Sequence, residues 1–250
     1  MEENYHRQIA FVPEQLPAMT VNDRQHLLLV DSCLPSHTFN KIARARLTEM
    51  DADRRIAEAV GHFRAASRPF AWLVGPCSRP LDLERRLEKH GLRAAEFELG
   101  MAADLTQLAA QMDLPAGLEV RRVRTPEELA DFAAVNLGDP PDAAVPAVCQ
   151  SAASLLLGQD CPNQLFVGYV DHCPAAASEL FLSAGLAGIY GVATREAFRR
   201  RGFALALTWI AADQGRRLGA TTAALQASER GRGVYARLGF SPCCQFVEYR

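Results

Sequence analysis

Three consecutive arginines, Arg199, Arg200 and Arg201, stand directly before Gly202. Apolar residues then recur at helical spacing from Phe203 onward, so the glycine lies at the start of a predicted helix. A helix start presents unpaired backbone N–H groups and the positive end of the helix dipole, and glycine lets an anion approach them without a Cβ in the way. The turn therefore predicts a phosphate-binding site. The sequence strings of nucleotide P-loops and of dinucleotide-binding folds are absent here, which favours a diphosphate ligand that needs no metal.

The strands and helices predicted on either side of this turn indicate an α+β fold. The helix after the turn ends at Leu218-Gly219. Three antiparallel strands lead into the turn, and a strand, a short helix and a closing strand follow the helix. We expect these elements at residues 165–169, 176–183, 186–194, 221–226, 231–238 and 240–249.

A strand and a capped helix precede these elements. Residues 118–123 predict the strand, and Thr125 opens the helix because threonine can cap it, Pro126 fits the first helical position and Glu128 completes a capping box. Residues 138–162 are rich in Pro, Asp, Ala and Gly, and we expect only a short helix there, around 147–157.

Two sequence elements of this second half resemble the GNAT family of N-acetyltransferases. Residues 199–204 resemble its acyl-CoA-binding signature, [QR]-x-x-G-x-[GA], with Arg199, Gly202 and Ala204 in the three defined places. Residues 234–240 are similar to its "Y-x-x-x-G-F" element, which here contains Tyr235. The resemblance covers residues 118–250 and implies a mixed, mostly antiparallel central sheet with flanking helices.

The resemblance also implies a place for acetyl-CoA, as a co-substrate. Its pyrophosphate would lie on the loop formed by Arg199, Arg200, Arg201, Gly202, Phe203 and Ala204. Its pantetheine arm would run along the preceding strand, at Val192, Ala193 and Thr194. The thioester would lie where this strand diverges from the strand at 221–226, and a bound amine would attack its carbonyl carbon directly.

The catalytic groups are less narrowly determined. Tyr235 matches the residue that often protonates the leaving thiolate in this family, and a buried aromatic with a bonded hydroxyl is the alternative. Glu179, on a mostly apolar strand, is the candidate general base, although it could equally face solvent. Ser228 could bond the cofactor or relay a proton through water, or it could simply cap a helix. Glu229 and His172 are more easily explained as surface residues of a loop and a turn.

The first half of the chain predicts a degenerate repeat of the second. We expect strands at residues 26–30 and 70–74, and helices around 40–49, 53–66 and 81–90. Residues 87–92 then precede a strand at 94–99 and echo residues 235–240, with Leu87 in the place of Tyr235. Residues 1–110 are therefore interpreted as a degenerate GNAT-like or other α/β domain without the phosphate loop, and residues 118–250 as the catalytic domain. The first domain would wall the acceptor cleft or bind the acceptor.

Composition narrows the function classes. Twenty-seven Lys and Arg residues against 29 Asp and Glu give a net charge of −2, which argues against a nucleic-acid binder. The longest uncharged run is too polar and too short for a membrane span. The seven cysteines show no zinc or disulfide pattern, so we expect a reduced, cytoplasmic protein without a metal.

These observations together predict an acetyl-CoA-dependent N-acetyltransferase acting on a small-molecule or peptide amine. A non-catalytic acyl-CoA-binding sensor or interaction protein is the alternative, because no general base is obvious. Whether the protein is a monomer or a homodimer stays open, as does the identity of the acceptor.

Overall fold

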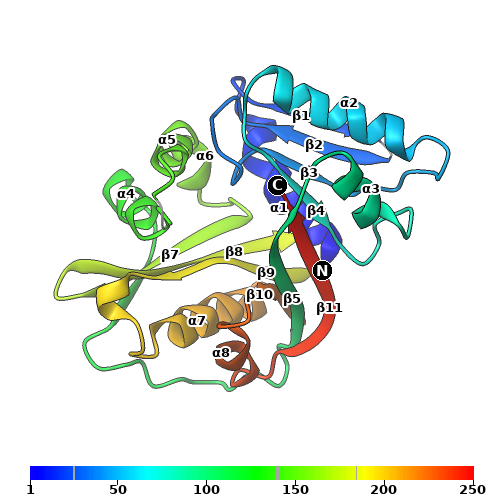
Figure 1. Cartoon of the computed structure of the whole chain (residues 1–250). Coiled ribbons are helices and arrows are strands. Elements are labelled where there is room, and N and C mark those ends of the chain that lie inside the picture. The colour runs from blue at the N-terminus through cyan, green and yellow to red at the C-terminus, as the bar shows by residue number, and fades with distance from the viewer. Residues whose placement is uncertain (25, 139–140, 184) are drawn as a thin grey trace. The chain divides into compact units, whose positions relative to one another are not determined.

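The computed structural model describes residues 1–24, 26–138, 141–183 and 185–250 (Figure 1). The chain forms two compact units. The N-terminal unit is Glu2–Leu99 together with Cys244–Arg250, and the C-terminal unit is Gly100–Cys243. Each unit packs helices against a mixed sheet, so the predicted α+β fold class is confirmed. Within the described ranges, no helix is both long and apolar enough to cross a membrane.

The N-terminal unit has the strand order β1-β2-β3-β4-β11. The β3–β4 pair is parallel, and the other neighbouring pairs are antiparallel. Its elements are α1 (Glu2–Gln15), β1 (Thr20–Arg24), β2 (Leu27–Asp31), β3 (Lys41–Ala43), α2 (Ala52–Ala65), β4 (Ala71–Val74), α3 (Leu83–Lys89), and parts of β5 (Ala94–Asp104) and β11 (Ser241–Tyr249).

Helices cover both faces of this sheet. On one face, Phe63 of α2 and Leu87 of α3 pack with Trp72 of β4 in a core that extends to Tyr249 of β11. On the other face, α1 contributes Ala10 to a smaller cluster with residues of β2, β3 and β4. Because successive strand residues point to opposite faces, the short strands β3 and β4 are buried on both sides.

The C-terminal unit has the strand order β6-β7-β8-β9-β10-β5, to which β5 contributes Gly100–Asp104. Strands β6 to β9 are antiparallel neighbours, and β9 and β10 run parallel. Its remaining elements are β6 (Glu119–Arg122), α4 (Pro126–Val135), α5 (Ala144–Ser151), α6 (Ala153–Leu156), β7 (Asn163–Val170), β8 (Cys173–Ser183), β9 (Leu186–Thr194), η1 (Glu196–Phe198), α7 (Phe203–Arg217), β10 (Thr222–Ala227) and α8 (Arg232–Ala236).

Helices α4 and α7 lie on opposite faces of this sheet (Figure 1). Helix α7 approaches β9 so closely that a Cβ on Gly215 would stand 2.6 Å from the Cβ of Ala187. The hydroxyl of Ser178 on β8 donates to the carbonyl oxygen of Leu207 on the same helix, at 3.1 Å. Ala187 and Ser178 therefore mark the face that α7 covers, and their strand neighbours face α4.

Most of the predicted elements form near the expected residues. The start of α4 is as predicted: Pro126 is its first residue, and the Glu128 N–H donates to Oγ1 of Thr125 at 3.3 Å. The segment 138–162 holds α5 and α6, and its residues 139 and 140 lie outside the described ranges.

One local prediction is wrong, and one helix was not predicted. The helix expected at 40–49 is instead the strand β3 followed by a turn in which Arg44 has φ +52°. The segment pairs with β2 on one side and with β4 on the other, and this tertiary pairing outweighs local propensity. Helix α1 was not predicted from its polar sequence; it forms because Ala10 and its apolar neighbours pack on the sheet.

The order of elements repeats in the two units. In the C-terminal unit, β9 and β10 are parallel neighbours joined by α7, and α8 follows. In the N-terminal unit, β3 and β4 are parallel neighbours joined by α2, and α3 follows. Leu87, aligned with Tyr235 in the sequence, is fully buried in the apolar core of its unit.

Candidate functional site

Strands β9 and β10 separate part-way along their length. Ala224 and Gly188 form the last parallel pair, although β10 continues to Ala227 and β9 to Thr194. Antiparallel pairing with β8 continues on the other side of β9 as far as Thr194. The backbone edges of β9 and β10 beyond Gly188 and Ala224 are therefore open toward each other.

A β-bulge changes the direction of β9 just beyond this point. Glu179 pairs with Tyr190, but Ala177 pairs with Ala193, so β9 carries an extra residue. Gly191 lies in this bulge with φ +55°, a conformation that glycine adopts without steric cost. Such bulges re-aim the backbone groups that follow them, here those of Val192, Ala193 and Thr194.

The basic turn 199–202 lies between β9 and α7, and its residues are exposed. Arg200 and Gly202 have φ of +62° and +83°, so two residues before the helix adopt the left-handed backbone conformation. Arg199 Nε donates to the carbonyl oxygen of Thr194 at 3.3 Å. The Arg201 guanidinium lies over the Phe203 ring at 4.9 Å. Arg199 is therefore held at the end of β9, and Arg201 lies against the first residue of α7.

The start of α7 fits an anionic ligand. Gly202 is its N-cap and supplies no side-chain acceptor, so the first N–H groups of the helix have no partner within it. Thr194 adds a buried hydroxyl oxygen, Oγ1, that has no hydrogen-bond partner in the described chain. Backbone donors, a basic turn and a missing Cβ are the features that bind a phosphate group. Among the described residues, no group of three or more His, Cys, Asp or Glu side chains could hold a metal ion.

Tyr235 and Ser228 lie together around Gly231. A Cβ on Gly231 would stand 2.9 Å from Cε2 of Tyr235 and 3.5 Å from Oγ of Ser228. Tyr235 is 9% exposed, and its ring meets Phe240 edge-on at 6.3 Å. Ser228 Oγ accepts a hydrogen bond from the Gly231 N–H at 3.3 Å, so this hydroxyl stabilises the turn before α8.

Glu179 lies on the sheet face toward α4. Its neighbour Ser178 points toward α7, so Glu179 points the other way. A Cβ on Gly191 would contact Asn136 Oδ1 at 3.4 Å, and Glu179 and Phe132 at 3.9 Å. Burial, with a smaller contribution from the Glu179 charge, raises the pKa of the Cys149 thiol on α5 to about 12. Asn136 was not singled out from the sequence, because only the fold brings it next to Glu179.

His172 and Glu229 are surface residues in the structure. His172 and Asp171 form the exposed turn between β7 and β8, with φ of +64° and +48°. Glu229 is exposed next to Ser228.

The family of this unit follows from comparison with known proteins. The model of the acetyltransferase (GNAT) family matches residues 136–240, which include the diverging strands and the basic turn. The chain contains a GNAT acetyltransferase domain. This GNAT assignment supports acyl transfer as the general chemistry of the C-terminal unit. No curated protein matches the sequence.

Solved GNAT structures share the fold over almost the whole chain. A GCN5-related N-acetyltransferase from Kribbella flavida is 20% identical with a TM-score of 0.73, covering 98% of this chain and 94% of that one. One from Sphaerobacter thermophilus is 20% identical with a TM-score of 0.63, covering 90% and 80%. A tandem GNAT protein from the clavulanic acid biosynthesis pathway is 15% identical with a TM-score of 0.61, covering 94% and 83%. At these identities the likeness concerns the fold.

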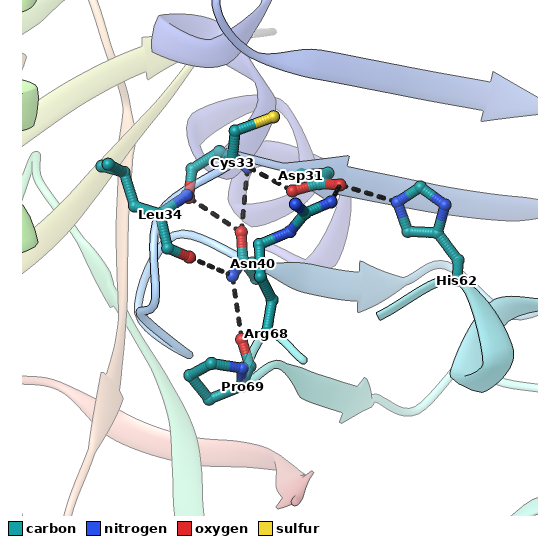
Figure 2. Close-up of polar contacts among 8 residues, drawn as sticks. Asp31, Cys33, Leu34, Asn40, His62, Arg68 and Pro69 are labelled. Atoms are coloured by element: carbon teal, nitrogen blue, oxygen red, sulfur yellow. Dashed lines mark hydrogen bonds and ion pairs between the residues drawn. The ribbon is translucent and has the colours of Figure 1, made fainter. Parts of the chain in front are cut away.

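A polar cluster in the N-terminal unit was not predicted from the sequence (Figure 2). Asp31, with its side chain 3% exposed, accepts hydrogen bonds from Arg68 Nη2 at 2.5 Å and from the Cys33 backbone N–H at 2.9 Å, and its Oδ2 lies 2.7 Å from His62 Nε2. Asn40 joins the two loops of the cluster by donating to the carbonyl oxygens of Leu34 and Pro69.

The hydrogen bonds in this cluster outweigh burial at Asp31. Burial raises the pKa of this carboxyl. Hydrogen bonds from Cys33, His62 and Arg68 lower the pKa by a larger amount, so it lies below its ordinary value. The cluster therefore fastens the end of β2 to the end of α2. The sequence offers an acidic residue after an apolar strand as its only signal, because the partners lie 31 and 37 residues away.

Proposed function

We propose that the protein is an acetyl-CoA-dependent N-acetyltransferase whose active site lies in the C-terminal unit. The observation that carries this proposal is the divergence of β9 and β10 beyond Gly188 and Ala224, next to the exposed basic turn that opens α7. In this proposal the N–H groups at the start of α7 and Arg199, Arg200 and Arg201 bind the pyrophosphate. Backbone groups of Val192, Ala193 and Thr194 bind the pantetheine arm, and the thioester lies between the two strands.

The proposed reaction is a direct transfer. The acceptor nitrogen forms a bond to the thioester carbonyl carbon while the carbon–sulfur bond breaks. Glu179 takes the proton that the amine loses, and Tyr235 gives its phenolic proton to the departing sulfur. A phenol suits this role because its ordinary pKa of about 10 is close to that of an alkyl thiol.

Ser228 has a supporting role in this proposal. Its hydroxyl adjoins the Tyr235 ring, since both border Gly231. From there it can bond the cofactor or pass a proton through water, while its oxygen still accepts from the Gly231 N–H. No metal takes part.

The proposal also covers the acceptor, the role of each half of the chain and the cellular location. The acceptor is a small-molecule or peptide amine, and the acyl group is acetyl. Residues 118–250 carry the reaction, whereas residues 1–110 form a half without a phosphate loop. The protein works in the cytoplasm and binds neither nucleic acid nor a membrane.

A thiol-release assay tests whether the protein catalyses acetyl transfer. The purified chain is mixed with acetyl-CoA and, separately, with simple amines, aminoglycosides, polyamines, amino acids and peptide N-termini. Release of coenzyme A that depends on an amine supports the enzyme. Tight binding of acetyl-CoA without release in any mixture would instead support an acyl-CoA-binding sensor.

A further inference from the structure

Gln226 lies on β10, two residues beyond the last pair with β9. Ala223 on this strand pairs with Ala187, which faces α7. Because side chains alternate along a strand, Leu225 and Ala227 also face α7 and Gln226 faces the opposite side. Gln226 therefore lies on the same face of the sheet as Glu179, at the open part of the strand pair.

The amide nitrogen of Gln226 is buried without a partner. Nε2 has no hydrogen-bond acceptor in the described chain. A buried donor without an acceptor costs stability, and most such donors in folded proteins are paired. A ligand oxygen that accepts from Nε2 would remove this cost, so the orphaned donor marks a position for a ligand atom.

Three polar side chains cross the sheet in one row. Glu179 on β8 is paired with Tyr190 on β9. The last β9–β10 pair is Gly188 with Ala224. Tyr190 and Gln226 each lie two residues beyond this pair, so they occupy corresponding positions on the two strands. Glu179 and Gln226 therefore lie on the same face of the sheet, on either side of Tyr190, where β10 has separated from β9.

We propose that Gln226 determines acceptor specificity by donating a hydrogen bond from Nε2 to an oxygen of the acyl acceptor. The preferred acceptor then carries a hydroxyl or carbonyl oxygen close to its amine, with the amine on the Glu179 side and the oxygen on the Gln226 side. This inference rests on the proposed N-acetyltransferase function.

Matched pairs of small amines test the proposal. Glycinamide and ethanolamine carry an oxygen near the amine, and propylamine is a probe of similar size without one. kcat/KM for each is measured by thiol release in the wild type and in Gln226→Met and Gln226→Glu, which lack the amide donor. We expect the preference for the oxygen-bearing amines to fall at least about tenfold in both variants, because a site built to bond a polar group discriminates strongly against its absence. The Kd for acetyl-CoA should stay within about twofold, since the proposal places the amide against the acceptor and not against the cofactor.

Thermal unfolding of the free protein provides a second readout. Gln226→Met removes an unpaired buried donor, so Tm should rise by about 2–4 °C. Gln214→Met is the matched control, because the Gln214 Nε2 already donates to Gln164 Oε1 at 3.1 Å. This control should lower Tm and leave the preference among amines unchanged.

The possible outcomes separate this inference from the proposed function. An unchanged preference among amines, an equal loss of rate with all of them, or a lower Tm in Gln226→Met would overturn the role of Gln226 alone. A wild type that binds acetyl-CoA but releases no thiol with any amine would overturn the proposed function, and this inference with it.

Discussion

The Arg79 backbone N–H donates to the carbonyl oxygen of Ala45 at 2.8 Å in the N-terminal unit. This bond joins the segments that follow the parallel strands β3 and β4, whereas the corresponding strands β9 and β10 of the C-terminal unit separate. Leu47 adds a second bond by donating to the carbonyl oxygen of Arg79 at 3.2 Å. The chain after β3 is thus hydrogen-bonded to the chain after β4, whereas β9 and β10 separate beyond Gly188 and Ala224. The backbone groups that would bind a pantetheine arm are already paired with each other in the N-terminal unit.

One molecule of acetyl-CoA should therefore bind per chain. Helix α2 also begins after Asp51 rather than after a basic, glycine-containing turn, so its start repels phosphate. Isothermal titration of the full chain with acetyl-CoA should give a stoichiometry of one. Two equivalents per chain would contradict the loss of the site in the N-terminal unit.

Replacing Tyr235 by phenylalanine should slow turnover without weakening acetyl-CoA binding. The ring keeps its contact with Phe240, and the phenolic hydroxyl, with its transferable proton, is lost. General acid catalysis contributes about a hundredfold or more to rate, so kcat should fall by about that factor while Kd for acetyl-CoA is unchanged.

Tyr169→Phe is the matched control for that variant. The Tyr169 hydroxyl donates to Asp131 Oδ2 at 2.9 Å, so its removal should affect stability but not kcat. Equal kcat in the wild type and in Tyr235→Phe would remove Tyr235 from the mechanism.

Asp31→Asn should destabilise the N-terminal unit by about 2 kcal/mol, the usual magnitude for hydrogen bonds to a buried charged group. The folded pKa of Asp31 lies below its unfolded value, so its contribution is present above about pH 4 and lost as pH falls through the folded pKa. Urea unfolding at pH 7 and at pH 3 should therefore show a larger difference between wild type and variant at pH 7.

Glu58→Gln is the control for the Asp31 measurement. Glu58 pairs with Arg54 on the exposed side of α2, where solvent screens the interaction. Its unfolding midpoint should match the wild type. An Asp31→Asn variant that is equally stable would show that the cluster in Figure 2 does not hold the unit together.

The sequence predicted the elements whose signals are local. The Thr125 cap, the helix after Gly202 and the strands around the basic turn depend on neighbouring residues, and they form where expected. The direction of Glu179 depends instead on the register of three strands and on a bulge at Gly191. Residue spacing in the sequence carries no information on that register.

Contacts between distant residues explain what the sequence did not predict. Lys41–Ala43 is a strand because β2 and β4 pair with it, although its local sequence suits a helix. Gln226 looked like an ordinary strand residue, because the sequence does not show that its side-chain nitrogen is buried with no partner among the described residues.

Binding of acetyl-CoA at the start of α7 is the central claim, and Gly202→Asp tests it most directly. The variant places a carboxylate at the proposed pyrophosphate position, where like charges repel. Gly219→Asp is the matched control, because Gly219 also has positive φ, at +91°, but follows the opposite end of the same helix. Calorimetry should show that Gly202→Asp loses at least about a hundredfold in acetyl-CoA affinity, while Gly219→Asp binds like the wild type. Unchanged affinity in a folded Gly202→Asp protein would contradict the claim.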